Sequence, residues 1–128
     1  MNRIVLAAAT DLVLTGLLLI ISPELFGWLI LNAEPSAAGR ALGHIAGVAM
    51  FGFGLATWPT PPAAPTSGIR ALLSFNLLAT IYLSYLGVAG QLAGVLLWPA
   101  VALHAALTCF LGRAWIVGGV KRDELPTT

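Results

Sequence analysis

Long apolar stretches with very few charges run through most of this chain of 128 residues. Hydrophobic residues make up 59% of the sequence and charged residues 9%, whereas soluble domains carry about 25% charged residues. A soluble fold of this composition would have too few polar side chains to face water, so the composition favours a bilayer as the solvent. The sequence therefore predicts one transmembrane domain over residues 1–120 and a polar cytoplasmic tail over residues 121–128.

Four stretches approach the roughly 20 apolar residues that a helix needs to cross a bilayer. They cover residues 3–21, 38–58, 69–87 and 91–115, and the last one allows an extension to residue 118. Consecutive spans cross the membrane in opposite directions, so we expect an all-α, antiparallel four-helix bundle. Asp11 interrupts the first stretch and no clear small-residue cleavage motif follows it, which predicts a retained helix and not a signal peptide.

The connections between the spans differ in composition. Within residues 22–37, the apolar stretch 25–31 is too short to span and predicts a short helix in the membrane interface, with Trp28 at headgroup level. Residues 59–68 are rich in proline and predict a stiff, extended loop without helix. Residues 88–90 predict a tight turn that makes the last two spans an antiparallel hairpin.

Basic residues are distributed unevenly between the two sides of the expected bundle. Arg40 alone lies on one side, and the other side carries Arg3, Arg70, Arg113, Lys121 and Arg122. Because cytoplasmic segments carry the excess of lysine and arginine, we expect a multi-pass inner-membrane protein with both termini in the cytoplasm. The formal net charge of +1 provides no basic field, so no nucleic-acid partner is expected.

Asp11 is the most informative single residue, because an ionisable side chain at bilayer depth costs a few kcal/mol or more and is usually functional. Asn76 and His104 lie at similar distances from the same membrane face when about 1.5 Å of rise is counted per helical residue. We therefore expect Asp11, Asn76 and His104 to meet as an inner polar cluster. Three alternatives stay open for these residues: a structural polar pin that fixes helix register, a site that handles protons or binds a ligand, and no contact between them.

A second set of polar and aromatic residues lies toward the outer side. It comprises Arg40, His44, Tyr82, Tyr85 and Trp98. The set predicts either a polar-lined outer cleft or the ordinary interfacial belt of aromatic residues with a snorkelling Arg40.

Small residues predict where helices approach closely. Gly39, Gly43 and Gly47 recur every four residues along the second span, which predicts a helix-packing face for another span or another subunit. Pro99 lies inside the expected fourth span and predicts a kink there.

Nothing in the chain predicts a metal site or a cofactor. His44 and His104 lie at different expected depths, which disfavours one haem with two histidine ligands, and the possible ligands are scattered rather than clustered. Cys109 is the only cysteine and lies in an apolar stretch, where packing is its expected role. We expect no metal and no cofactor.

The segments 74–87 (SFNLLATIYLSYLG) and 97–104 (LWPAVALH) resemble small four-helix bacterial inner-membrane proteins that are DoxX-like in layout. Members of that group are named for thiosulfate–quinone oxidoreduction. The resemblance therefore implies a membrane location and a quinone-linked accessory subunit, and it transfers no functional residue to this chain.

Three functions are compatible with these features. The first is an accessory subunit or a binding module for a lipid or quinone-type hydrophobic ligand, with the bilayer, a larger membrane complex or a homo-oligomer as partners. The second is a proton-coupled transporter of small molecules that uses Asp11. The third is a membrane enzyme that acts on a lipidic substrate with Asp11 and His104 as an acid–base pair.

Overall fold

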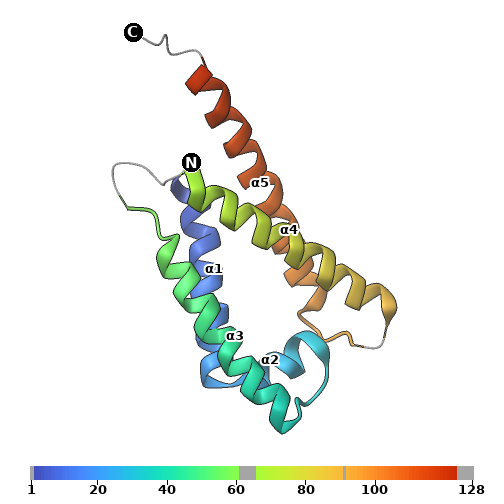
Figure 1. Cartoon of the computed structure of the whole chain (residues 1–128). Coiled ribbons are helices and arrows are strands. Elements are labelled where there is room, and N and C mark those ends of the chain that lie inside the picture. The colour runs from blue at the N-terminus through green and yellow to red at the C-terminus, as the bar shows by residue number, and fades with distance from the viewer. Residues whose placement is uncertain (1, 61–65, 91, 124–128) are drawn as a thin grey trace.

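The computed structural model describes residues 2–60, 66–90 and 92–123, and every regular element within these ranges is a helix (Figure 1). The elements are α1 (Asn2–Ile21), α2 (Pro23–Phe26), the π-helix η1 (Gly27–Leu31), α3 (Ala37–Ala56), α4 (Thr66–Ala89) and α5 (Leu97–Asp123). The predicted all-α class is confirmed. So is the presence of a short helical segment in the first connection, which α2 and η1 form.

The long helices pack mainly as two pairs. α1 lies along α3, and α4 lies along α5, while α1 touches α4 and α5 over shorter stretches (Figure 1). α4 diverges from α1 and α3 toward its C-terminal end. The buried core forms where the two pairs meet, from Val5, Ala8 and Leu12 of α1, Ile69 and Leu72 of α4, and Leu107 and Leu111 of α5.

Glycine residues bring α1 and α3 into backbone contact. A Cβ atom at Gly47 would lie 2.8 Å from the carbonyl oxygen of Gly16, and one at Gly16 would lie 2.6 Å from the backbone nitrogen of Phe51. Any larger residue would clash at these two positions, so only glycine allows this backbone contact. Small residues are typical of places where two helix axes approach closely. The partner of the packing face is thus α1 of the same chain.

The predicted packing face is only partly correct. Gly43 lies against Pro23 and Leu19, and Gly47 lies against α1, but the nearest neighbours of Gly39 are Pro35 and Ser36. Gly39 belongs to the start of α3, where its backbone N–H donates to the Ser36 hydroxyl oxygen at 3.1 Å as part of an N-cap. The face that packs on α1 instead continues to Gly54, which lies against Val13 and Ala9.

The fourth predicted span begins later than residue 91. α4 continues through Ala89, and α5 begins only at Leu97. The backbone N–H groups of Gly94 and Leu96 donate to the carbonyl oxygens of Ile30 and Leu29 of η1, each at 2.9 Å. These bonds hold the segment before α5 against η1 in place of a continuing helix.

Pro99 consequently lies in the first turn of α5 and not in its middle. The first turn has no intrahelical acceptor for its N–H groups, so a proline is tolerated there without a kink. The predicted kink is therefore wrong. The predicted non-helical loop over 59–68 is also wrong at its end, because α4 already begins at Thr66, while residues 61–65 lie outside the described part.

Three helices are long and apolar enough to cross a membrane, over Arg3–Ile21, Ser67–Ala89 and Leu97–Val117. Helix α3, the second span predicted from the sequence, is not among them. Its length is similar, and Arg40, His44 and several glycines lower its mean hydropathy. These three helices and the many exposed large apolar side chains indicate a membrane protein.

Candidate functional site

Three helices bring Asp11, Asn76 and His104 together. Asp11 comes from α1, Asn76 from α4 and His104 from α5, at the level where the two helix pairs meet. The Nδ1 atom of His104 lies 2.9 Å from Asn76 Oδ1 and 3.8 Å from Asp11 Oδ2. The inner polar cluster expected from matched depths thus exists as a spatial group, centred on the imidazole.

The amide of Asn76 orients this imidazole. Asn76 is buried, with 1% of its surface exposed, and its Nδ2 donates to the carbonyl oxygen of Leu72 at 2.8 Å. A carbonyl only accepts, so this bond directs the amide NH₂ toward the helix backbone and leaves Oδ1 facing His104. An amide oxygen also only accepts, so His104 Nδ1 carries the proton of the bond. In the neutral ring, Nε2 is then the unprotonated nitrogen.

Asp11 is placed to interact with His104 by charge and not by a hydrogen bond. The distance of 3.8 Å exceeds hydrogen-bond range, and the Nδ1 proton is already donated to Asn76. No hydrogen bond to the Asp11 carboxyl group forms among residues 2–60, 66–90 and 92–123. An imidazolium at His104 would be attracted to this carboxylate, whereas a neutral imidazole gains little from it.

Both groups keep free hydrogen-bonding atoms that are not enclosed. The side chains of His104 and Asp11 are 12% and 19% exposed. Every fully buried side-chain nitrogen or oxygen in the described part of the chain has a hydrogen-bond partner, so the unpaired His104 Nε2 and Asp11 carboxyl oxygens are accessible from outside the core. The cluster therefore has one satisfied contact, at Asn76, and exposed atoms without a hydrogen-bond partner among the described residues, His104 Nε2 and the Asp11 carboxyl oxygens, which we call its open side.

The side chains around the cluster are either aromatic or threonines whose hydroxyl groups are hydrogen-bonded within their own helix. The Phe75 ring meets the His104 ring edge to face at a centroid distance of 6.1 Å, and Phe53 lies 6.1 Å from Phe75. Thr80 and Thr108 donate their hydroxyl protons to the carbonyl oxygens of Asn76 and His104, each at 2.8 Å. Electrostatic screening is weak in such surroundings, so an ion pair or hydrogen bond formed at the open side is stronger than it would be in water.

The five residues of the expected outer cleft are not brought together. Arg40 and His44 lie on α3, where Arg40 bonds back to the α1–α3 connection and His44 contacts the C-terminal end of α1. Arg40 contacts Glu24 at 3.4 Å and donates to the Pro35 carbonyl at 3.1 Å, and His44 Nδ1 lies 3.0 Å from the Ile20 carbonyl.

The aromatic members of that set belong to the other helix pair. Tyr82 and Tyr85 are exposed on α4, and the Trp98 ring of α5 lies against Gly87. α3 packs against α1 and α2, while α4 packs chiefly against α5, so equal depth here does not mean lateral contact. These five residues therefore do not form one shared cleft, and the belt interpretation stays a prediction.

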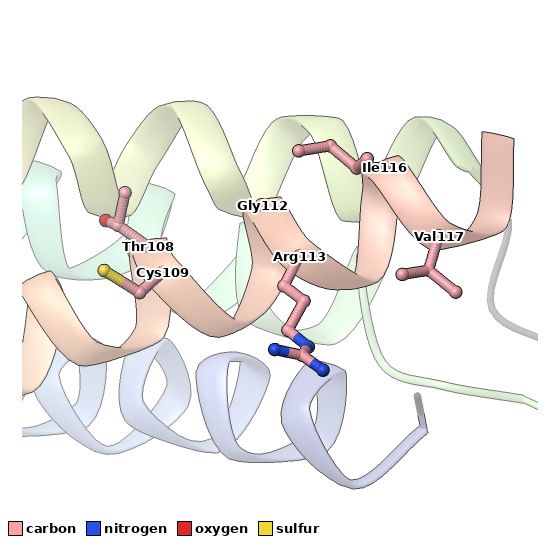
Figure 2. A pocket seen from close by; sticks show the side chains of 6 residues that line it. All are labelled: Thr108, Cys109, Gly112, Arg113, Ile116 and Val117. Atoms are coloured by element: carbon pink, nitrogen blue, oxygen red, sulfur yellow. The ribbon is translucent and has the colours of Figure 1, made fainter. Parts of the chain in front are cut away.

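Sequence reasoning missed an open groove on α5. It has a volume of about 520 Å³ and is lined by Thr108, Cys109, Gly112, Arg113, Ile116 and Val117 (Figure 2). The spacing of these residues places them along one helical face. An arginine among apolar neighbours, Arg113, is the sequence feature that could have indicated this groove. No group of three histidine, cysteine, aspartate or glutamate side chains suited to a metal ion occurs in the part of the chain that the structure describes.

Comparisons with protein-family models, with curated proteins and with solved structures found no match to this chain.

Proposed function

We propose that this protein is a membrane-embedded binding module for a hydrophobic ligand with a polar carbonyl or hydroxyl head, of the quinone type. The ligand head would bind at the open side of the Asp11–Asn76–His104 cluster. In this proposal the module serves as an accessory subunit of a larger membrane complex or as a homo-oligomer. The DoxX-like four-helix layout remains part of the proposal.

The observation that carries the proposal is the asymmetry of His104. Its Nδ1–H is donated to a buried amide oxygen, while its Nε2 and the neighbouring carboxyl oxygens are accessible and have no hydrogen-bond partner among the described residues. A polar pin whose purpose is helix register would be expected to satisfy both sides of the ring. A fixed tautomer with a free Nε2 is suited to accepting a proton from a ligand hydroxyl, or to donating one to a carbonyl when the ring is charged.

The proposed setting is an inner membrane crossed by four antiparallel helices with both termini in the cytoplasm. Three helices meet the length and apolarity of a span, and α3 would complete the bundle by packing its glycine face on α1. Arg40 and His44 near its start would then lie in the headgroup region, where their bonds to Glu24, Pro35 and Ile20 reduce the cost of burying them.

Titration of the purified protein with decylubiquinone in detergent, followed by tryptophan fluorescence, tests this proposal. Saturable quenching beyond that of empty micelles with free tryptophan is expected. His104→Gln and Asp11→Asn should each weaken binding about tenfold, the loss of one hydrogen bond to a charged or strongly polar group. Helical circular dichroism and gel filtration of each variant establish that it is folded.

Two controls match these substitutions in chemistry and differ in place. His44→Gln changes a histidine outside the cluster, and Glu24→Gln neutralises an exposed carboxylate. Neither should change the dissociation constant. Quenching that does not saturate, or equal affinities for the wild type and both cluster variants, would show that the cluster is not the binding site.

Proton-coupled transport is the second candidate, because two groups that can each take up and release a proton, a carboxyl and an imidazole, lie 3.8 Å apart within apolar helices. Proteoliposomes with an imposed pH gradient and a trapped pH dye would report such a flux. Transport predicts proton movement that depends on an added solute and stops in Asp11→Asn. Binding without transport predicts the same slow leak in all variants.

A further inference from the structure

The groove on α5 has a single charged side chain, Arg113, and no acidic side chain among its lining residues. The lining begins at Thr108 and Cys109 and ends at Ile116 and Val117, which are large, exposed apolar residues. Figure 2 shows the Arg113 side chain extending away from the α5 ribbon, with Ile116 and Val117 on the following turn. The groove therefore combines one cation with an apolar face.

The cation of this groove has no partner within the chain as far as the structure describes it. The ion pairs among the described residues join Arg40 to Glu24 and His104 to Asp11, and neither involves Arg113. Thr108 is uncharged and donates its hydroxyl proton to the carbonyl oxygen of His104 at 2.8 Å, so it supplies no counter-charge to the guanidinium. Arg113 also lies inside the apolar span Leu97–Val117, about one turn from its end.

An unpaired guanidinium near the end of a transmembrane helix is most stable when its long side chain reaches the phosphate layer. The planar guanidinium donates two parallel N–H bonds to phosphate oxygens. The apolar residues beside it would contact the upper part of an acyl chain. One class of ligand provides both the phosphate and the acyl chain: a lipid in which an anionic head and a hydrocarbon tail are covalently joined.

We propose that the groove lined by Thr108, Cys109, Gly112, Arg113, Ile116 and Val117 is a binding site for an anionic phospholipid. Its phosphate head binds Arg113, and its acyl chain lies along the apolar part of the groove. This inference rests on α5 lying in a bilayer and is independent of ligand binding at the Asp11–Asn76–His104 cluster. It assigns the lipid a fixed position on the end of α5 that lies beside the N-terminal end of α1 (Figure 1).

Native mass spectrometry of the full-length protein tests the proposal directly. Detergent-solubilised protein is titrated with phosphatidylglycerol and, separately, with phosphatidylcholine of the same acyl chains. The first phosphatidylglycerol should bind about fivefold more tightly than phosphatidylcholine, the factor expected for one basic residue at an anionic membrane surface. Inorganic phosphate alone should neither bind nor displace the lipid, because it lacks the acyl chain.

Three variants identify the residue responsible. Arg113→Gln should abolish the preference for phosphatidylglycerol, and Arg113→Lys should retain most of it. Arg70→Gln is the matched control, because it removes an exposed arginine from α4 at the same end of the α4–α5 hairpin but outside the groove. Circular dichroism establishes that each variant is folded.

The single cysteine gives a second readout at the groove itself. In nanodiscs, phosphatidylglycerol should slow the labelling of Cys109 by a small thiol reagent several-fold relative to phosphatidylcholine alone, and Arg113→Gln should remove this protection. Equal lipid affinities, or a preference that persists in Arg113→Gln and is lost in Arg70→Gln, would overturn the proposal. Displacement of the lipid by inorganic phosphate would overturn the acyl-chain part of it.

Discussion

The imidazole of His104 is hydrogen-bonded to Asn76, through Nδ1 and Oδ1 2.9 Å apart, and not to the carboxylate of Asp11. The amide is itself fixed by its bond to the Leu72 carbonyl. This relationship determines the tautomer of the ring and leaves Nε2 and the Asp11 carboxyl group without a hydrogen-bond partner in the part of the chain that the structure describes. The following predictions separate the structural part of the cluster from its open part.

Asn76→Leu should destabilise the protein, because it leaves the Nδ1–H of His104 without an acceptor in an apolar environment. The expected loss in the free energy of unfolding is about 1–3 kcal/mol, measured by denaturant titration in detergent. Thr80→Val removes only a local bond to the Asn76 carbonyl and should change stability by much less. In the double variant Asn76→Leu/His104→Leu both partners are gone, so part of the loss should be recovered.

Asp11→Leu should raise the free energy of unfolding or leave it unchanged, whereas Asn76→Leu should lower it. The carboxyl group makes no hydrogen bond in the described part of the chain, and a carboxylate at the centre of a span costs roughly 2.5–3.5 kcal/mol on insertion scales. The same denaturant titration measures this change in the free energy of unfolding. The variant should also bind quinone more weakly. A clear loss of stability in Asp11→Leu would favour the structural-pin interpretation.

Gly47→Ala should separate α1 from α3, because its Cβ would lie 2.8 Å from the Gly16 carbonyl oxygen and 2.9 Å from the Ile20 nitrogen. Backbone atoms cannot move aside as a side chain does, so we expect a loss of about 1–3 kcal/mol in unfolding free energy. Gly52→Ala on the same helix has nothing within 4 Å of its Cβ. That control should be neutral or stabilising by about 0.5–1 kcal/mol.

Gly94→Ala should release the segment before α5 from η1, because the new Cβ would overlap the Leu29 carbonyl group. The N–H groups of Gly94 and Leu96 would lose their acceptors on η1. Hydrogen exchange followed by mass spectrometry should show faster exchange over 92–96 while the core of α4 is unchanged. Val95→Ala trims an exposed side chain of the same segment and should leave exchange unaltered.

The sequence placed the cluster residues at matched depth, and the structure brings them together near the level where the two helix pairs meet. Matched depth succeeded there because the rise per residue is fixed, so sequence position measures height along each helix. It failed for the outer set, because height says nothing about lateral distance. Arg40 and His44 lie on one helix pair, and Tyr82 and Tyr85 lie on the other, where α4 diverges from α3.

By itself the sequence determined the all-α class, the approximate helix positions and the unusual place of Asp11, since apolar stretches and proline are local properties of the chain. The tertiary structure decided which acceptor binds His104, which glycines meet α1 and where α5 begins. Each of these depends on a group distant in sequence, such as Asn76, Gly16 or Leu29, whose backbone or side chain supplies a contact that no local pattern encodes.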